Sequence, residues 1–163
     1  MAEQYTNDPM QEVFIFETSQ QLEQMEQSVI KTEALGSYPS ETINEIFRIM
    51  HTIKSSAAMM LINNMSVVAH TTEDMFYFIR EEKPQTIDVS TLSDLVFEGI
   101  DFMKGELEKI KTGADADGNP EILIDRIKAH LKILKENNNL TDSLTVNNEP
   151  VTEKYYISSN KAA

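Results

Sequence analysis

Apolar residues recur every three or four positions along most of the chain, which is the spacing of an amphipathic helix. Five prolines and five glycines divide this pattern into long segments. No alternation of polar and apolar residues is long enough to predict a strand. We therefore expect five helices, over residues 9–31, 40–60, 65–82, 88–112 and 120–135.

Local signals mark the ends of these helices. Asp8 and the proline after it form a helix start, and Thr42 with Glu45 has the spacing of a capping box. The two asparagines at 63–64 are expected to make the turn between the second and third helices. Because short connections favour antiparallel neighbours, the predicted fold is all-α, an up-and-down antiparallel helical bundle.

Each predicted helix has one apolar face that we expect to form the core. In the first three helices these residues are Val13, Phe14, Phe16, Leu22, Met25, Val29, then Ile43, Ile46, Met50, Ile53, Ala57, Met60, then Met65, Val68, Ala69, Thr72, Phe76 and Ile79. In the last two they are Leu92, Leu95, Val96, Gly99, Phe102, Met103, Leu107, Ile110, then Ile122, Leu123, Ile127, Leu131 and Leu134.

The composition changes near residue 137, where asparagine, threonine and serine replace the apolar pattern. Such a segment buries too little apolar surface to fold by itself. We predict a bundle domain over residues 1–137 and a flexible linker or tail over 138–163. The three residues at 155–157, Tyr-Tyr-Ile, are its one apolar spot.

Charge and composition exclude several classes of function. The chain has 14 Lys and Arg against 27 Asp and Glu, a formal net charge of −13, which opposes binding to nucleic acid. There is no cysteine, and hence no disulfide, thiolate nucleophile or cysteine-based zinc site. No apolar run is long enough to span a membrane, and residues 1–8 are too polar for a secretory signal, so a cytoplasmic location is expected. No known ATP-binding motif is present.

The segment around His51 carries the most specific chemistry. Phe47, His51, Lys54 and Ala58 are spaced four, three and four residues apart, so they form a line along the edge of the second helix. Ser55 and Ala58 are small and leave room for another protein. This pattern suits a histidine that temporarily carries a phosphoryl group, although a half-exposed histidine without function has the same pattern.

A carboxylate on the third helix could complete this site. Glu73 lies beside the apolar stripe and could reach a ring on the second helix, where it would fix the imidazole tautomer and leave Nε2 free. The plain alternatives are a surface pair with His70, three residues earlier, or a Glu73 side chain that is simply solvated.

Other patterns are weaker. A metal site built from His51, His70 and Glu73 lacks a second ligand one turn from His51. The loop at 115–119 resembles a calcium loop, but Gly118 is at its fourth position rather than its sixth, so we interpret it as a turn. His130 is interpreted as an ordinary surface or boundary residue.

The residues His51–Ala58, HTIKSSAA, resemble the phosphorylation motif of histidine phosphotransfer (HPt) domains. With His70-Thr-Thr-Glu73 after it, the segment is most similar to the N-terminal HPt domain of CheA-type chemotaxis histidine kinases. The resemblance covers residues 11–137 and is specific between 47 and 80. The family usually has glycine where this chain has Ser55, and often has glycine before the next turn, at 61–62 here.

The resemblance implies a four-helix HPt bundle with a fifth C-terminal helix, and a role for each site residue. His51 would be phosphorylated on Nε2, Glu73 would bind Nδ1, and Lys54 would hold the phosphoryl oxygens. His70 would support the same network. The partner-docking surface would include Phe47, Ser55 and Ala58.

The resemblance also implies the partners. A separate kinase domain would bind ATP and Mg²⁺, so this chain would bind no cofactor or metal itself. The phosphoryl group would pass to an aspartate in the receiver domain of a CheY-like response regulator. Whether the chain is part of a histidine kinase or a free-standing HPt phosphorelay protein stays open, as do a non-catalytic adaptor and a metal-binding bundle enzyme.

Overall fold

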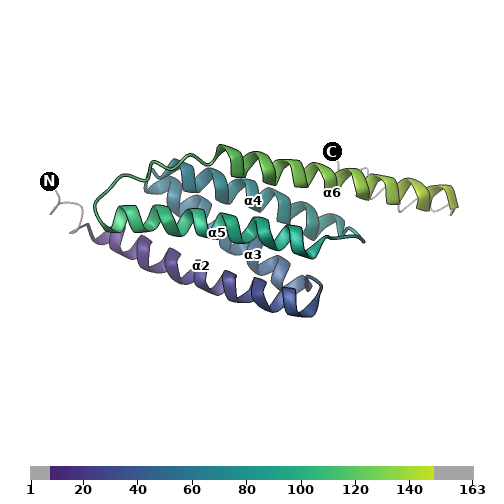
Figure 1. Cartoon of the computed structure of the whole chain (residues 1–163), viewed down its shortest axis with the longest axis horizontal. Helices are drawn as coiled ribbons and strands as arrows, with labels where there is room; N and C mark the ends of the chain where they lie inside the picture. The colour runs from purple at the N-terminus through teal and green to yellow at the C-terminus, as the bar shows by residue number, and fades with distance from the viewer. Residues whose placement is uncertain (1–7, 149–163) are drawn as a thin grey trace.

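The computed structural model describes the backbone of residues 8–148 and the side chains of residues 8–139. Every element in this part of the chain is a helix, and the helices lie side by side along one long axis (Figure 1). They are α2 (Pro9–Leu35), α3 (Ser40–Met59), α4 (Asn63–Glu82), α5 (Val89–Lys111) and α6 (Glu121–Asn148). The predicted all-α bundle is confirmed. None of the described helices has an apolar stretch that could cross a membrane.

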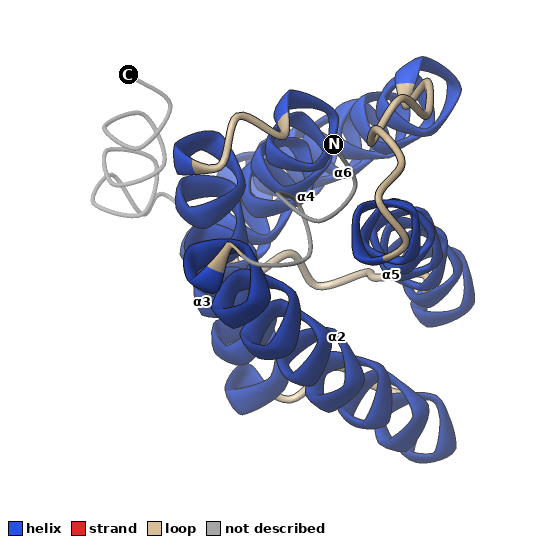
Figure 2. Ribbon diagram, turned by 90° about the vertical axis from the view of Figure 1, so that its left-hand side faces the viewer, coloured by secondary structure: helices blue, strands red, loops and turns tan. Residues whose placement is uncertain are grey.

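Helices α2 to α5 surround a common core, which Figure 2 views from one end of the bundle. The helices α3 and α4 make the most extensive contact, α2 packs on α5 and α3, and α6 lies against α4 and α5. The largest fully buried side chains include Leu22, Met25, Ile46, Met50, Ile53, Met65, Phe76, Leu92, Ile100 and Met103. The bundle therefore holds α3 and α4 together along most of their length.

The predicted core is largely confirmed in α3, α4 and α5 but partly wrong in the outer helices. Val13 and Phe16 are exposed, and the buried stripe of α2 includes Thr18 and Thr32 instead. The Thr32 hydroxyl donates to the carbonyl of Ser28 at 3.0 Å, and this bond satisfies the hydroxyl and lets it enter the core. In α6, Ile122 is exposed and Ile124 is buried in its place.

The turn between α3 and α4 is not made by the two asparagines at 63–64, which begin α4. Leu61 makes it instead, with a φ of 63° in the left-handed region. The Leu61 N–H donates to the carbonyl of Ala58 at 3.0 Å, and the Ile62 N–H donates to that of Ala57 at 2.8 Å. These two bonds form a Schellman motif in which leucine takes the place usually held by glycine.

The capping box expected at the start of α3 does not form. The N-cap residue is Pro39, whose side chain cannot accept a hydrogen bond. Glu45 turns toward α2, where it accepts from the Ser28 hydroxyl at 2.5 Å. The acidic residue therefore links two helices rather than capping one.

The last helix is longer than the pattern predicted, because α6 continues past residue 135 to Asn148. No glycine or proline occurs between Pro120 and Pro150, and asparagine, threonine and serine each lower helix stability by less than about 0.7 kcal/mol. The division of the chain at residue 137 stays a prediction. The tyrosines and isoleucine at 155–157 lie outside the described residues.

A buried polar cluster joins α4, α5 and the loop before α6. The Asn64 amide donates to Oε1 of Glu106 at 2.9 Å and to the carbonyls of Ala116 and Gly118 at 3.2 and 3.0 Å. The Gly118 N–H also donates to Oε1 of Glu106, at 3.0 Å. The carbonyls of Ala116 and Gly118 in this loop therefore serve packing between helices.

Candidate functional site

The centre of the site is a pair of side chains from α3 and α4. Nδ1 of His51 lies 2.5 Å from Oε2 of Glu73. The two side chains differ sharply in exposure, because 57% of His51 is exposed and only 8% of Glu73. The carboxylate is thus a buried partner for one nitrogen of a ring whose other edge faces outward.

The local packing explains why these two residues meet. Met50 and Ile53 are fully buried between the helices, so His51 between them falls at the edge of the contact. The hydroxyl of Ser66 on α4 donates to the carbonyl of Lys54 on α3 at 3.0 Å, and the tight turn at Leu61 fixes the alignment of the two helices. This alignment of the two helices places Glu73 of α4 beside His51 of α3.

Lys54 completes a line of charges across Glu73. Its ammonium lies 2.8 Å from Oε1 of the carboxylate, so each oxygen of Glu73 faces its own partner. Burial raises the pKa of Glu73, but the contacts from Lys54 and His51 outweigh burial and hold the pKa below its ordinary value. Glu73 is therefore ionised at neutral pH.

An ionised carboxylate can only accept a hydrogen bond. In the neutral ring the proton therefore sits on Nδ1 of His51, and the lone pair of Nε2 is free. A neutral imidazole with a free nitrogen in solvent is a nucleophile, and the nearby negative charge stabilises the cation that forms when Nε2 makes a bond.

The structure brings together only some of the predicted site residues. His51, Glu73 and Lys54 form one network. His70 is exposed, and its Nε2 lies 3.5 Å from the carboxylate of Asp74, one turn further along α4. Within the described residues its pairing is with Asp74 and not with His51. Ser55 and Ala58 are exposed on α3, as a docking surface would require.

The sequence pattern did not identify one aromatic and one basic residue of α4, Tyr77 and Arg80, that pack on Phe47. Tyr77 packs on Phe47 with ring centroids 6.1 Å apart, and the guanidinium carbon of Arg80 lies 4.1 Å from the Phe47 centroid. Both follow Glu73 at four and seven residues, which is the spacing of one helix face. This spacing could have identified Tyr77 and Arg80 from the sequence.

His130 lies outside this site and is more buried than predicted. Its side chain is on α6 and is enclosed by the bundle. Burial lowers its pKa, and the opposing effect of Asp88 does not compensate. The hydropathy pattern of α6 did not predict that His130 is buried, because the buried face of that helix runs through Ile124 and Ile127 rather than Ile122.

Comparison with known proteins decides the family. The model of the family described as the Hpt domain matches residues 9–117. The chain belongs to the Hpt domain family. Its Hpt domain thus includes all of α2 to α5 and the whole His51 network.

Similar proteins include a chemotaxis protein and a sensor histidine kinase. The Hpt chain is 30% identical over 125 residues to the chemotaxis protein CheA of Treponema pallidum, covering 77% of this chain and 15% of that protein. It is 29% identical over 135 residues to the sensor histidine kinase CheAY of Helicobacter pylori, covering 80% and 16%. The chain therefore spans less than a fifth of the length of these relatives.

A solved structure has the same fold. It is a crystal structure of the phosphorylated P1 domain of CheA3 in complex with CheY6 from R. sphaeroides. The TM-score is 0.68 at 20% identity, and the match covers 77% of this chain and 97% of that one. The Hpt bundle of this chain is thus similar in its overall course to a P1 domain.

Proposed function

We propose that this Hpt domain is the phosphoryl carrier of a chemotaxis-type two-component system, with His51 as the phosphorylated residue. The observation that carries the proposal is the hydrogen bond from Nδ1 of His51 to buried Glu73, which leaves Nε2 free on the exposed edge of the ring. The CheA relatives and the phosphorylated P1 domain with the same fold support it.

The first step loads the histidine. The lone pair of Nε2 attacks the γ-phosphorus of ATP held by a kinase domain, and the bond from that phosphorus to the β–γ bridging oxygen breaks. ADP leaves with that electron pair. The proton on Nδ1 stays between His51 and Glu73, whose negative charge stabilises the phosphorylated ring cation.

In the second step the phosphoryl group leaves His51 for the response regulator. A carboxylate oxygen of an aspartate on a response regulator attacks the phosphorus, and the N–P bond breaks with its electrons returning to Nε2. The ring is then neutral again with its proton still on Nδ1, ready for another cycle. We propose that ATP and Mg²⁺ are bound by partner domains, since the sequence has no ATP-binding motif.

Lys54 has a proposed part in both states. In the resting chain its ammonium neutralises Glu73. A phosphoryl group adds a charge of about −1.5 to −2 next to it. The side chain is 29% exposed and flexible, so its ammonium can turn to the phosphoryl oxygens once they are present.

The surface around His51 is suited to docking of the partners. Ser55 and Ala58 are exposed and small, and allow close approach. A groove of about 140 Å³ lies next to them, between the start of α2 and the end of α3. Its lining includes Met10, Val13, Phe14, Thr52, Ser56 and Met59. We propose that a CheY-like receiver domain approaches over this face.

The relatives also suggest the setting. We propose that the chain acts in the cytoplasm and is the front part of a CheA-type kinase. In that setting α6 leads toward the next domain. A free-standing phosphorelay protein is the second candidate, and both share the same reaction at His51.

Radiolabelling tests the proposal. The chain is incubated with labelled ATP and an active CheA-type kinase core, and then with a CheY-like regulator. We expect a label that is acid-labile and alkali-stable, that passes to the regulator, and that is lost in His51→Gln. An unlabelled wild-type chain beside a kinase core that labels its own P1 domain would refute the proposal and favour an adaptor.

A further inference from the structure

The ring of Phe47 lies against the ring of His51. The two residues are one turn apart on α3, their centroids are 6.3 Å apart and their planes are inclined by only 17°. Helical side chains lean toward the N-terminus and cover the preceding turn. The His51 side chain therefore leans toward the turn that carries Phe47. A His51 ring that rotates inward meets the ring of Phe47.

Phe47 is itself held from α4. Tyr77 packs on it with centroids 6.1 Å apart, and the guanidinium carbon of Arg80 lies 4.1 Å from its centroid and 5.5 Å from that of Tyr77. A guanidinium at this distance from an aromatic face is attracted by the electron density of the ring. The Phe47 ring beside His51 is thus held in place by residues of α4, the helix that also carries Glu73.

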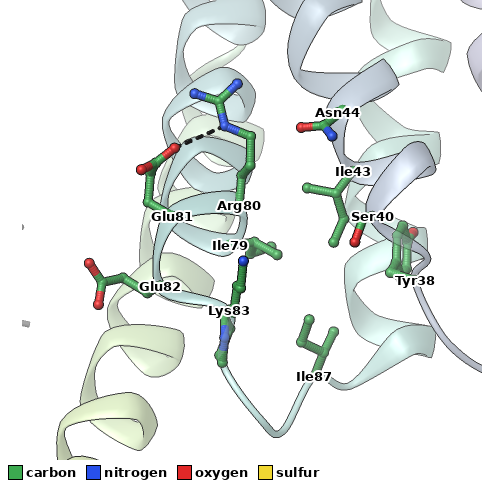
Figure 3. A pocket seen from close by; sticks show the side chains of 11 residues that line it. Tyr38, Ser40, Ile43, Asn44, Ile79, Arg80, Glu81, Glu82, Lys83 and Ile87 are labelled. Carbon is green, nitrogen blue, oxygen red and sulfur yellow. Dashed lines mark hydrogen bonds and ion pairs between the residues drawn. The ribbon is translucent and has the colours of Figure 1, made fainter. Parts of the chain in front are cut away.

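Arg80 is held in turn by its neighbour. Figure 3 shows Arg80 at one end of a groove between the start of α3 and the end of α4, with its guanidinium turned away from Lys83 and Ile87. Its Nε donates to Oε2 of Glu81 at 3.1 Å. This bond favours the conformation in which the guanidinium lies over Phe47.

We propose that Phe47, braced by Arg80 and Tyr77, is a positioning residue that keeps the His51 ring on Glu73. A ring that is 57% exposed can leave its single hydrogen bond by rotating about its side-chain torsions. The near-parallel Phe47 ring blocks part of that rotation. Nε2 then stays at one place and in one tautomer, which is what a phosphoryl acceptor needs.

This inference rests on the proposed function and changes the role expected for Phe47. A docking residue would bind the partner, whereas a positioning residue acts on His51 before any partner arrives. The two roles differ in the kinetics of phosphorylation. Loss of docking raises KM, and loss of positioning lowers kcat.

The test compares Phe47→Leu, Phe47→Tyr and Arg80→Gln in the full chain. In Phe47→Leu we expect kcat for phosphorylation by a CheA-type kinase core to fall about 10-fold with KM nearly unchanged, since small misplacements of reacting groups are costly. Phe47→Tyr keeps the aromatic ring and should keep kcat for phosphorylation near the wild-type value. Arg80→Gln should have a smaller effect in the same direction and is less able to disturb folding, because its side chain is 34% exposed.

A second measurement needs no phosphorylation. Long-range ¹H–¹⁵N spectra of the imidazole should show one tautomer, protonated at Nδ1, in the wild type and a mixture in Phe47→Leu. Phe78→Leu is the matched control, because Phe78 is also a half-buried phenylalanine under a cation, Lys135, on the α6 side of α4. It should change neither readout.

The possible outcomes distinguish a failure of the proposed function from a failure of the positioning role of Phe47 alone. An unlabelled wild type would refute the proposed function. A labelled wild type with an unchanged tautomer and an unchanged kcat in Phe47→Leu would overturn the positioning role alone. A rise in KM without a fall in kcat would also overturn it and assign Phe47 to docking.

Discussion

The exposed ring of His51 and the buried carboxylate of Glu73 meet at 2.5 Å across the contact between α3 and α4. The carboxylate is charged because Lys54 and His51 outweigh the effect of its burial. This arrangement makes one nitrogen a fixed donor and the other a free nucleophile. Its consequences can be measured one residue at a time.

Replacing the carboxylate should slow the reaction at His51. In Glu73→Ala we expect the phosphorylation rate to fall roughly 10- to 100-fold, the range known for loss of a hydrogen-bond partner that orients a metal-binding histidine. The helical circular dichroism should be retained. The control is Glu98→Ala, which removes a carboxylate that is paired with Arg126 and distant in sequence from His51. Equal rates in Glu73→Ala and the wild type would show that Glu73 does not set the tautomer.

The buried acid Glu106 should make stability depend on pH. Burial raises its pKa, but hydrogen bonds from Gly118 and Asn64 and the contact with Lys109 outweigh it, so the pKa is lowered on folding. A carboxyl of this kind stabilises the fold above its unfolded pKa of about 4.3, and the contribution disappears as pH falls through the folded pKa.

Denaturant titrations of Glu106→Gln test this expectation. At pH 7 the variant should lose about 1–3 kcal/mol of unfolding free energy, since one partner of a buried polar cluster is changed. The difference from the wild type should shrink as pH drops below about 4. A difference that stays constant from pH 7 to 3 would contradict the assignment of this pH dependence to Glu106.

Gly118 is required by the same cluster. A Cβ added there would lie 2.5 Å from Oε2 of Glu106, whose side chain is pinned by Asn64 and Lys109. We expect Gly118→Ala to cost about 1–2 kcal/mol by disturbing the bond from the Gly118 N–H to the carboxylate. Combined with Glu106→Gln the loss should be less than additive, whereas full additivity would mean that the two positions act independently.

Leu61 offers a substitution that should stabilise the protein. Its φ of 63° costs a non-glycine residue about 1–2 kcal/mol, and the residue is 82% exposed, so little packing would be lost. Glycine gains entropy in the unfolded chain, which offsets part of the gain. We expect Leu61→Gly to raise the unfolding free energy by about 0.5–1 kcal/mol. Leu61→Ala is the control and should bring no such gain.

Sequence patterns predicted the helices and the buried faces of α3, α4 and α5, because those faces are apolar at nearly every turn. They failed where polar residues enter the core with satisfied hydrogen bonds, as Thr32 does in α2. They also failed where an ordinary residue adopts an unusual backbone conformation, as Leu61 does. Neither feature changes the local hydropathy pattern.

The candidate site shows the same division. The resemblance around His51 and Glu73 named the central pair, and the structure brings the two together. The spacing along one helix could not show that Lys54 pairs with Glu73, whereas the four-residue spacing of His70 and Asp74 is that of a pair within one helix. The Lys54–Glu73 pairing depends on how α3 and α4 align, which is set by the turn at Leu61 and by packing far along the chain.

The position of the phosphoryl group on the ring tests the central claim most directly. The chain is phosphorylated by a CheA-type kinase core, and ³¹P and long-range ¹H–¹⁵N spectra are recorded on the product. We predict a single phosphohistidine, at His51, with phosphorus on Nε2 and the proton still on Nδ1. Phosphorus on Nδ1 of His51, or on any other residue, would contradict the account.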